Sequence, residues 1–433
     1  MISMTSASGT KPFPVKSDVA CPLKWQWSTL FLYHGTTNSC HRTMLSYLPP
    51  QDTGKFHNTA EKIEQRKIML NGNWPERGKG CEYCKDIEDA GGMSDRTTNL
   101  WLHETDPSYS RFISPELIKD PRELEVTPTI LEVYFTNRCN MSCIYCGPDF
   151  STQWVKENKR FGSLDRHLNK TDTHRAKLQD TVYTERLAAF WQWMEANYQT
   201  LKQFHVLGGE PFYQTETEDT IQFWQDHPNP DLELRIFSNL KVPIKKFAAI
   251  LSSLESLNKS KKCRSVGIIA SIDCWGKEAE YLRTGLNLRD WLKNFEYLIH
   301  QSWCHVAINA TVSALSIKTM PELFTKVNEW NEKRKDTSQI SISFNMLQDP
   351  ACMHAGIFAK GFFDAEFDRM LNMMPTENQW EISNRNYLIG VRKVVDAKEK
   401  SDAKISALKA YLSEMDRRRK TNWKEMFPWL VLE

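Results

Sequence analysis

Three cysteines crowd into one short loop of the sequence. Cys139, Cys143 and Cys146 follow the spacing C-x3-C-x2-C within the segment VYFTNRCNMSCIYCGP. A structural zinc site normally closes four ligands around the ion, and no fourth cysteine stands near these three. Three thiolates instead suit a four-iron cluster that keeps one iron open. The alternatives are a zinc site with a distant fourth ligand, or three thiols buried as packing groups.

Four more cysteines lie in the first hundred residues. Cys21 and Cys40 frame Gly35 in the spacing C-x13-G-x4-C, and Cys81 and Cys84 form a C-x2-C pair. In a reduced compartment, clustered thiols indicate a metal site. We expect Gly35 to supply the positive φ of a hairpin turn. Both iron-sulfur clusters and zinc accept such pairs. The scattered cysteines are expected to pack as small hydrophobes: Cys263, Cys274, Cys304 and Cys352.

Alternating strands and helices must position these cysteines. From about residue 128, β-branched and aromatic runs predict strands, and residues with helical spacing lie between them. This alternation predicts an α/β fold with a parallel sheet and right-handed crossovers. We expect a partial, TIM-like (β/α)6 barrel rather than an open doubly wound sheet. The predicted strands span 129–136, 203–209, 233–240, 265–273, 305–314 and 339–347, and the predicted helices span 184–201, 243–257, 287–301 and 321–334.

Four segments are expected along the chain. Residues 1–20 are polar and aperiodic, which predicts a disordered N-terminus. Residues 21–115 are loop-rich with little helical pattern, which suggests a small metal-cluster domain. Residues 120–350 form the partial barrel, and residues 351–433 form a helical C-terminal extension. In α/β barrels the chemistry lies in loops at the carboxyl ends of strands, which is where the three clustered cysteines fall.

The three clustered cysteines resemble the cluster motif of the radical S-adenosylmethionine (SAM) superfamily. The matching residues read CNMSCIYC, with Tyr145 directly before the last cysteine as a candidate cofactor contact. In that family, SAM chelates the open iron of a [4Fe-4S] cluster through its amino and carboxylate groups. An electron then splits the sulfonium, and the 5′-deoxyadenosyl radical takes a hydrogen atom from a substrate C–H bond. The resemblance implies an enzyme with this chemistry.

Loops after the later strands resemble the SAM-binding motifs of that family. The stretch LGGEPF resembles the GGEP motif that binds the SAM amino group, and its glycines would let the backbone approach a ligand closely. Arg283 is a candidate partner of the SAM carboxylate, because the guanidinium fork matches carboxylate geometry. Cys274 stands where the family often has glycine. The other candidate SAM contacts are Gly208, Gly209, Glu210, Pro211, Ser238, Asn239, Ser271 and Asp273.

The N-terminal segment resembles the twitch and SPASM domains that carry auxiliary clusters. Its stretch CPLKWQWSTLFLYHGTTNSC matches their C-x(9–15)-G-x4-C hairpin, although here the hairpin precedes the barrel. Radical SAM proteins with an N-terminal twitch domain share this order, and CEYCKDIEDAGGMSDR and RRRKTNWKEMFPWL also resemble them. The resemblance implies a second, auxiliary [4Fe-4S] cluster, with structural zinc as the alternative. Its implied ligands are Cys21, Cys40, Cys81 and Cys84.

Composition and charge limit the partners of the chain. A formal net charge of +2 over 433 residues gives no electrostatic argument for nucleic acid or a membrane surface. The sequence has no run of about 18 apolar residues that would predict a membrane span. The N-terminus lacks the apolar core of a signal peptide. We therefore expect a cytoplasmic protein with reduced thiols.

The sequence is compatible with three functions. The favoured one is radical modification of a peptide or protein side chain, such as oxidation, crosslinking or epimerisation. The same chemistry on a small metabolite, a sugar or a nucleotide, is the alternative, because a fold does not determine a substrate. A non-catalytic metal-binding module is the third. An electron donor such as flavodoxin or ferredoxin is the expected partner, and the sequence identifies no residue that donates or accepts the second hydrogen.

Overall fold

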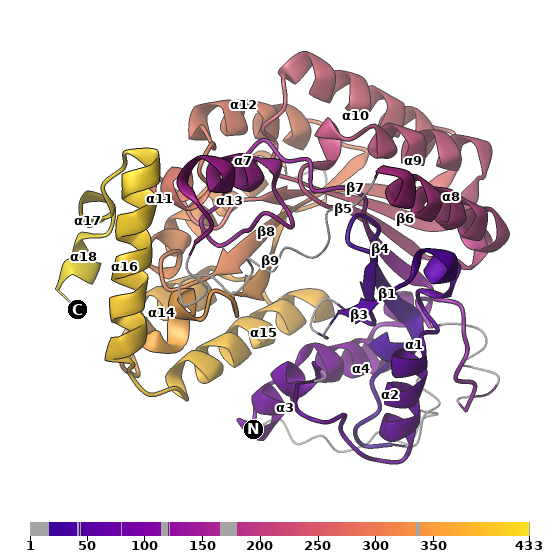
Figure 1. Ribbon diagram of the computed structural model, residues 1–433, viewed down its shortest axis with the longest axis horizontal. Coiled ribbons are helices and arrows are strands. Elements are labelled where there is room, and N and C mark those ends of the chain that lie inside the picture. The colour runs from indigo at the N-terminus through magenta and orange to yellow at the C-terminus, as the bar shows by residue number, and fades with distance from the viewer. Residues whose placement is uncertain are drawn as a thin grey trace.

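A nine-stranded sheet organises the chain (Figure 1). The computed structural model describes residues 17–40, 43, 45–78, 80–113, 120, 122–164, 180–334 and 338–432. Residues 1–16 of the predicted disordered N-terminus lie outside the described residues. The strands follow the order β3-β2-β1-β4-β5-β6-β7-β8-β9. They are β1 (Trp27–Phe31), β2 (Thr36–Asn38), β3 (Ser46–Tyr47), β4 (Ile130–Tyr134), β5 (Gln203–Leu207), β6 (Asn229–Ser238), β7 (Cys263–Ser271), β8 (Cys304–Val312) and β9 (Ser341–Met346).

The parallel α/β sheet predicted from the sequence is confirmed. Strands β4 to β9 coincide with the six predicted strands, and each pairs in parallel with the next. The structure adds β1 at the other side of β4, also parallel, with Trp27 opposite Ile130. Strands β2 and β3 continue the sheet as antiparallel neighbours. The N-terminal segment thus shares one sheet with the segment that was expected to form the barrel.

Helices follow the strands and cover one face of the sheet, as expected for right-handed crossovers. Figure 1 shows them along the outer side of the curved sheet. The four predicted helices are present, and the structure adds α7, α9 and α11, which are short or polar. The helices of this region are α7 (Thr152–Phe161), α8 (Asp180–Asn197), α9 (Thr215–Asp226), α10 (Ile244–Lys259), α11 (Lys277–Leu282), α12 (Leu288–Ile299) and α13 (Met320–Lys333).

The two faces of the sheet differ in burial. Along β8, Val306, Ile308 and Ala310 are fully buried, whereas Ala307 and Asn309 between them are half-exposed. Strands β6 and β9 alternate in the same way. A closed TIM barrel packs its interior with side chains. Here the side chains on the face turned away from the helices are only partly buried along β6, β8 and β9.

The prediction that residues 21–115 contain little helix is wrong. This segment forms α2 (Ala60–Leu70), α3 (Glu82–Asp89) and α4 (Asp95–Thr105), besides short α1 (Leu23–Gln26) and α5 (Pro107–Ser110). Their apolar residues are few, so the helical period is weak in the sequence. Capping compensates: the Thr59 side chain accepts the Lys62 amide at the start of α2, and Ser94 forms a capping box with Thr97 at the start of α4.

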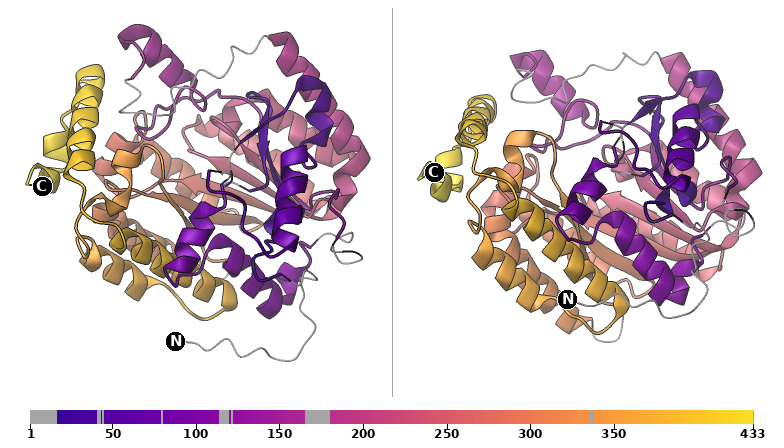
Figure 2. Two further views of the ribbon diagram at one scale, coloured as in Figure 1. Left: turned by 60° about the horizontal axis from the view of Figure 1, so that its bottom comes forward. Right: turned by 90° about the horizontal axis from the view of Figure 1, so that it is seen from below.

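The C-terminal segment is helical and contacts the N-terminal helices. It comprises α14 (Asp364–Met373), α15 (Gln379–Asp396), α16 (Asp402–Arg419), α17 (Trp423–Met426) and α18 (Pro428–Val431). Helix α15 contacts α3 and α4, and the Tyr83 and Tyr387 hydroxyls lie 2.8 Å apart across this contact. Figure 2 shows α15 beside the N-terminal helices, across the open side of the sheet. The C-terminal segment therefore helps to hold the N-terminal segment in place.

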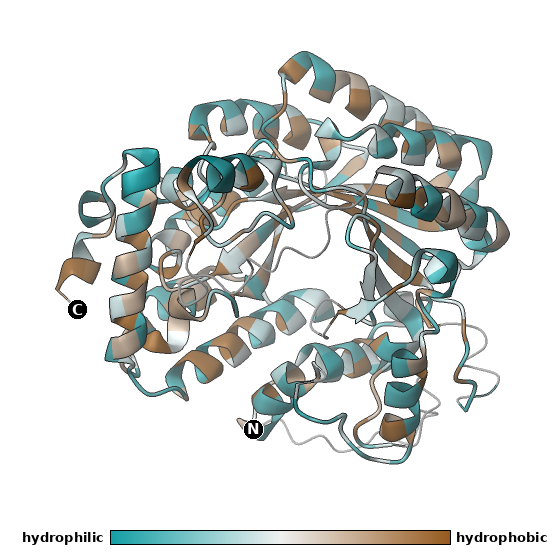
Figure 3. Cartoon of the chain, in the orientation of Figure 1, coloured by the Kyte–Doolittle hydropathy of each residue, from teal (hydrophilic) through white to brown (hydrophobic). Residues whose placement is uncertain are grey.

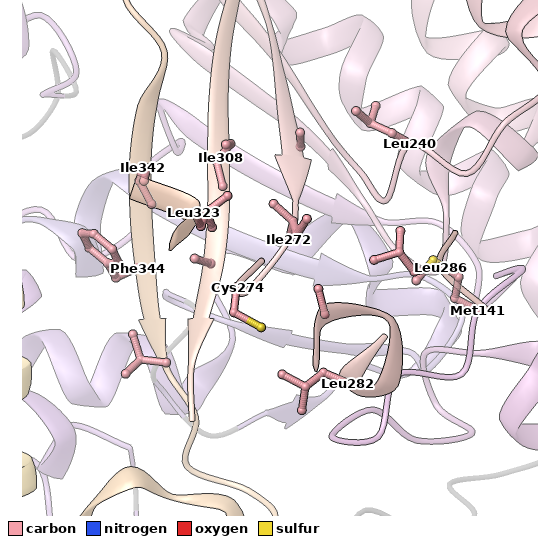
Figure 4. Close-up of a cluster of buried hydrophobic side chains, with 14 of the residues drawn as sticks. Met141, Leu240, Ile272, Cys274, Leu282, Leu286, Ile308, Leu323, Ile342 and Phe344 are labelled. Carbon is pink, nitrogen blue, oxygen red and sulfur yellow. The ribbon is translucent and has the colours of Figure 1, made fainter. Parts of the chain in front are cut away.

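Apolar residues concentrate in the sheet, and polar residues concentrate on the outer faces of the helices (Figure 3). The scattered cysteines follow this pattern, and their predicted role as packing residues is confirmed by exposed fractions of 0–6%. Figure 4 shows Cys274 among apolar side chains that include Ile272 and Leu282. Within the described part of the chain, every helix is too short or too polar to cross a bilayer.

Candidate functional site

The loop after β4 brings Cys139, Cys143 and Cys146 together at the carboxyl end of the sheet. All three thiols are partly exposed. Two backbone hydrogen bonds join the loop to the end of α11 and the residues that follow it. The Ser142 amide donates to Thr284 O at 2.9 Å, and the Ile144 amide donates to Leu282 O at 2.8 Å. The thiols are therefore held by backbone contacts from a distant part of the chain.

Side chains from three helices and loops fix the same loop. The Trp154 indole donates to Cys143 O at 2.9 Å, and the Tyr411 hydroxyl on α16 donates to Ile144 O at 2.5 Å. The side-chain amide nitrogen of Asn239 lies 3.8 Å from the Cys139 sulfur. Tyr411 and Trp154 lie outside the family motifs, and their spacing from the cysteines gives no signal in the sequence.

Electrostatic coupling shows that the three thiols are close neighbours. Burial raises the pKa of Cys139 to about 12, and Cys143 beside it adds to the shift. Burial also raises the pKa of Cys143, and the positive charge of nearby Arg283 opposes this rise. Because only thiolates bind metals, a bound metal would have to displace these protons.

The GGEP loop touches the cysteine loop directly. The Gly209 amide donates to Thr136 O at 3.1 Å, and the Glu210 amide donates to Arg138 O at 2.7 Å. A Cβ atom on Gly209 would lie 2.2 Å from Arg138 O, a backbone atom that cannot swing away. The glycine at this position therefore permits close approach of two backbone segments. Its neighbour Gly208 has a φ of +109°, which favours glycine.

Glu210 joins two strand ends at the centre of the site. Its fully buried carboxylate accepts three hydrogen bonds. They come from the Ser238 hydroxyl at 2.7 Å, the backbone amide of Asn239 at 2.7 Å and the backbone amide of Phe212 at 3.1 Å. Pro211 follows in the short 3-10 helix Pro211–Tyr213, which Glu210 caps. Burial raises the pKa of Glu210 to about 7, because desolvation outweighs the hydrogen bonds that favour the charged form.

This shift predicts a pH dependence of stability that Glu210→Gln should remove. The folded chain holds the proton with a pKa near 7 instead of the ordinary 4.5. The resulting stabilisation is complete below about pH 4.5 and is lost as the pH rises through about 7. In urea unfolding, the free energy of wild type relative to Glu210→Gln should fall between about pH 5 and about pH 8. Glu218→Gln, at an exposed site on α9, is the control; a parallel pH profile for wild type and Glu210→Gln would contradict the prediction.

Tyr145, Asp273 and Arg283 form a buried network beside the cysteines. The Tyr145 hydroxyl donates to Asp273 at 2.6 Å, and Arg283 grips the same carboxylate with two hydrogen bonds of 3.0 Å. The Thr311 amide donates to Asp273 as well, at 3.0 Å. Arg283, predicted to meet a SAM carboxylate, is thus paired with Asp273 in this structure. Ser271 lies apart from the network, at the end of β7 on the half-exposed face.

The four N-terminal cysteines line one small cavity. Cys21, Cys40, Cys81 and Cys84 share its wall with apolar side chains and two cations, Lys24 and Arg96. Burial raises the pKa of Cys21 to about 12, with Cys40 and Cys81 as close electrostatic neighbours. The predicted hairpin is confirmed, since Gly35 turns the chain between β1 and β2 with a φ of +62°. The chain thus gathers all four thiols around one space.

The spacing of these thiols differs from that of a single-ion site. Among the residues that the structure describes, no three histidine, cysteine, aspartate or glutamate side chains are placed to hold one metal ion. A four-iron cluster gives each thiolate its own iron, so its ligands stand farther apart than the four ligands of one zinc.

Known proteins are similar to this chain only remotely. No protein-family model and no curated protein matches it. The solved structure described as "Native anSMEcpe with bound AdoMet" shares 15% identity at a TM-score of 0.33, over 61% of this chain and 62% of that chain. A second, "Native anSMEcpe with bound AdoMet and Kp18Cys peptide", shares 13% identity at a TM-score of 0.31, over 57% and 58%. This chain spans less than two thirds of either protein, and neither likeness assigns it a fold or a function.

Proposed function

We propose that the chain is a radical SAM enzyme. The observation that carries the proposal is the meeting of three thiols with the GGEP loop and the Asp273–Arg283 pair at one end of a parallel sheet. These segments are far apart in sequence, yet they touch the same loop. A packing role would not account for the partial exposure of the three cysteines, and it would not require the buried Asp273–Arg283 pair beside them.

The residues divide into those that hold the cluster and those that hold SAM. Cys139, Cys143 and Cys146 would ligate a [4Fe-4S] cluster, which supplies an electron for reductive cleavage of SAM. The backbone of the GGEP loop would bind the SAM amino group, with Glu210 fixing the loop from inside. Tyr145 and the Asp273–Arg283 pair would position the cofactor from the β7 side. The remaining proposed contacts are Gly208, Gly209, Pro211, Ser238, Asn239 and Ser271.

The N-terminal cysteines are proposed to hold an auxiliary [4Fe-4S] cluster in a twitch-like segment. The shared cavity of the four thiols supports one metal site with all four as ligands, and the resemblance to twitch domains favours a cluster over zinc there. With four cysteine ligands, such a cluster would have no open iron for a substrate. Its role would then be to carry electrons from a flavodoxin- or ferredoxin-like donor, or to stabilise the fold.

A peptide segment is the proposed substrate. The half-exposed face of the sheet carries uncharged polar side chains on β8 and β9, where the Asn345 amide donates to the Asn309 side-chain oxygen at 2.7 Å. Arg235 on the same face is paired with Glu233 at 2.9 Å. Amides and hydroxyls suit peptide groups, whereas phosphorylated metabolites are usually bound by free cations. The polarity of this face therefore favours a peptide over a nucleotide, whereas an unphosphorylated sugar, which amides and hydroxyls also bind, stays the alternative substrate.

Iron content tests the proposal most directly. The wild type, reconstituted without oxygen, should bind about eight irons with sulfide, and the variant with Cys139, Cys143 and Cys146 changed to alanine should bind about four. Under reduction, only the wild type should convert SAM to methionine and 5′-deoxyadenosine. A variant with Cys263 and Cys304 changed to alanine is the matched control, since both are buried packing residues. Absence of iron from the wild type would refute the radical SAM assignment.

A further inference from the structure

Two buried lysines lie in the N-terminal segment, one of them in the wall of the cavity of the four cysteines. Lys24 lines the cavity with an exposed fraction of 2%, and its ammonium group donates to the Gln65 side chain. Lys62, also 2% exposed, donates to Ser28 Oγ at 2.7 Å, Thr37 Oγ1 at 2.8 Å and Phe56 O at 2.6 Å. Every one of these acceptors is uncharged, so neither lysine gains an ion pair from its hydrogen bonds.

The buried face of α2 carries Lys62 and packs against the cluster that contains three of the N-terminal cysteines. Lys62, Arg66 and Met69 are its buried residues, and Met69 packs in the same apolar cluster as Cys21, Cys40 and Cys81. Lys62 bridges β1 and β2, the hairpin that leads to Cys40. Burial lowers the pKa of Lys62 well below its ordinary value, with Arg66 and Lys24 adding to the shift, and negative charge at Cys40 acts against it. Lys24 likewise interacts electrostatically with Cys21. Lys24 thus lies in the cavity wall itself, and Lys62 lies behind the β1–β2 hairpin that carries Cys40.

These cations lack carboxylate partners. Within the described ranges, no Asp or Glu oxygen lies within 4 Å of the charged groups of Lys24, Lys62 or Arg66; Glu125 acts on Arg66 only from farther away. Arg96, the other cation of the cavity wall, is by contrast paired with Glu88. Burying a charge without a partner costs several kcal/mol. An anion in the cavity would remove most of that cost.

A four-thiolate metal site would be such an anion. Four thiolates on a divalent metal ion, or on a four-iron core of the same charge, carry about two excess negative charges. We propose that Lys24 and Lys62 are the built-in counter-charges of the N-terminal metal site, and that they raise the reduction potential of its cluster. This inference rests on the proposed auxiliary cluster. It gives the pair a defined role: a nearby positive charge favours the reduced, more negative cluster, which makes that cluster a better electron acceptor.

A redox titration tests the inference. The full-length chain with Cys139, Cys143 and Cys146 changed to alanine isolates the N-terminal cluster, whose midpoint potential can be followed by electron paramagnetic resonance. Lys24→Met should lower the reduced-to-oxidised ratio at a fixed potential about tenfold, a shift of about 59 mV to a more negative midpoint. Lys62→Met should act in the same direction. Lys24→Arg should keep the wild-type potential, and Lys67→Met, on the exposed face of α2, is the matched control.

The outcomes separate the inference from the proposed function. Retained iron with an unchanged midpoint in both methionine variants would overturn the role of the lysines and leave the cluster standing. If the site holds zinc and no iron, the auxiliary cluster fails, and the inference is then judged by zinc affinity, which Lys24→Met should lower about tenfold in a chelator competition. An unchanged zinc affinity, or no metal at all, would overturn it. If a methionine variant does not fold, the Lys24→Gln and Lys62→Gln variants, which retain a hydrogen-bond donor, take its place.

Discussion

Replacing Gly209 with alanine is expected to remove the cluster at Cys139, Cys143 and Cys146. The new Cβ would lie 2.2 Å from Arg138 O and 2.5 Å from its carbonyl carbon. Both are backbone atoms of the cysteine loop, so relief requires the loop to move rather than a side chain to rotate. The hydrogen bonds of 3.1 Å and 2.7 Å between the two loops would break with that movement. Overpacking of this kind costs about 1–3 kcal/mol of folding stability.

Iron content and SAM cleavage measure this effect. Gly209→Ala should bind about four irons where the wild type binds about eight, and it should form no 5′-deoxyadenosine. The matched control is Gly54→Ala, because a Cβ there would meet its nearest neighbour, Trp193, at 4.0 Å. If Gly209→Ala keeps full iron and cleaves SAM like the control, the contact between the two loops does not position the thiols.

This steric result also changes the meaning of the GGEP glycines. The sequence predicts that they let the backbone approach a ligand, because glycine lacks a Cβ. The structure shows that Gly209 lets the β5 loop approach the cysteine loop. The residue type indicated a close approach correctly. The partner in that approach is a segment some seventy residues earlier in the chain, and composition or local spacing carries no information about it.

Strands of the sheet were predictable where their patterns are local. Strands β4 to β9 are continuous apolar or alternating runs, which parallel strands covered by helices require. The pairing of β1 with β4 escaped prediction because WSTLF is short, and because the two strands lie about a hundred residues apart in the chain. The helices α2 to α4 were not predicted for a different reason. Their apolar faces are narrow, and the buried face of α2 includes Lys62 and Arg66.

The candidate site was predictable by residue type but not by pairing. The cysteine groups were identified from their spacing, and the GGEP loop and the β7 loop from their resemblance to radical SAM motifs. The sequence did not predict that Glu210 binds Ser238 and the backbone amide of Asn239, or that Arg283 binds Asp273. Polar residues at strand ends have several possible partners, and only the packing of the loops selects among them. The contact of Tyr411 with Ile144 depends on the C-terminal helix and has no local signal at all.

Breaking the Asp273–Arg283 pair should have the largest effect on stability. The side chains of Asp273 and Arg283 are 1% and 8% exposed, and two hydrogen bonds of 3.0 Å join them. Arg283→Met would leave the Asp273 carboxylate buried with only the Tyr145 hydroxyl and the Thr311 amide. Removing one member of a buried pair costs about 3–5 kcal/mol, because the other charge stays behind without compensation. The free energy of unfolding in urea should fall by that amount.

The double variant separates charge compensation from lost packing. Asp273→Asn combined with Arg283→Met removes both charges, so it should be more stable than Arg283→Met alone, because no unpaired carboxylate remains. The surface pair Arg369–Glu322, with side chains 53% and 43% exposed, is the control; losing it should cost about 0–1 kcal/mol. A cost for Arg283→Met no greater than that of the surface pair would show that the buried pair does not hold the β7 loop. If the stability loss appears as expected but iron content stays at the wild-type level, the pair supports the fold without positioning the cysteine loop.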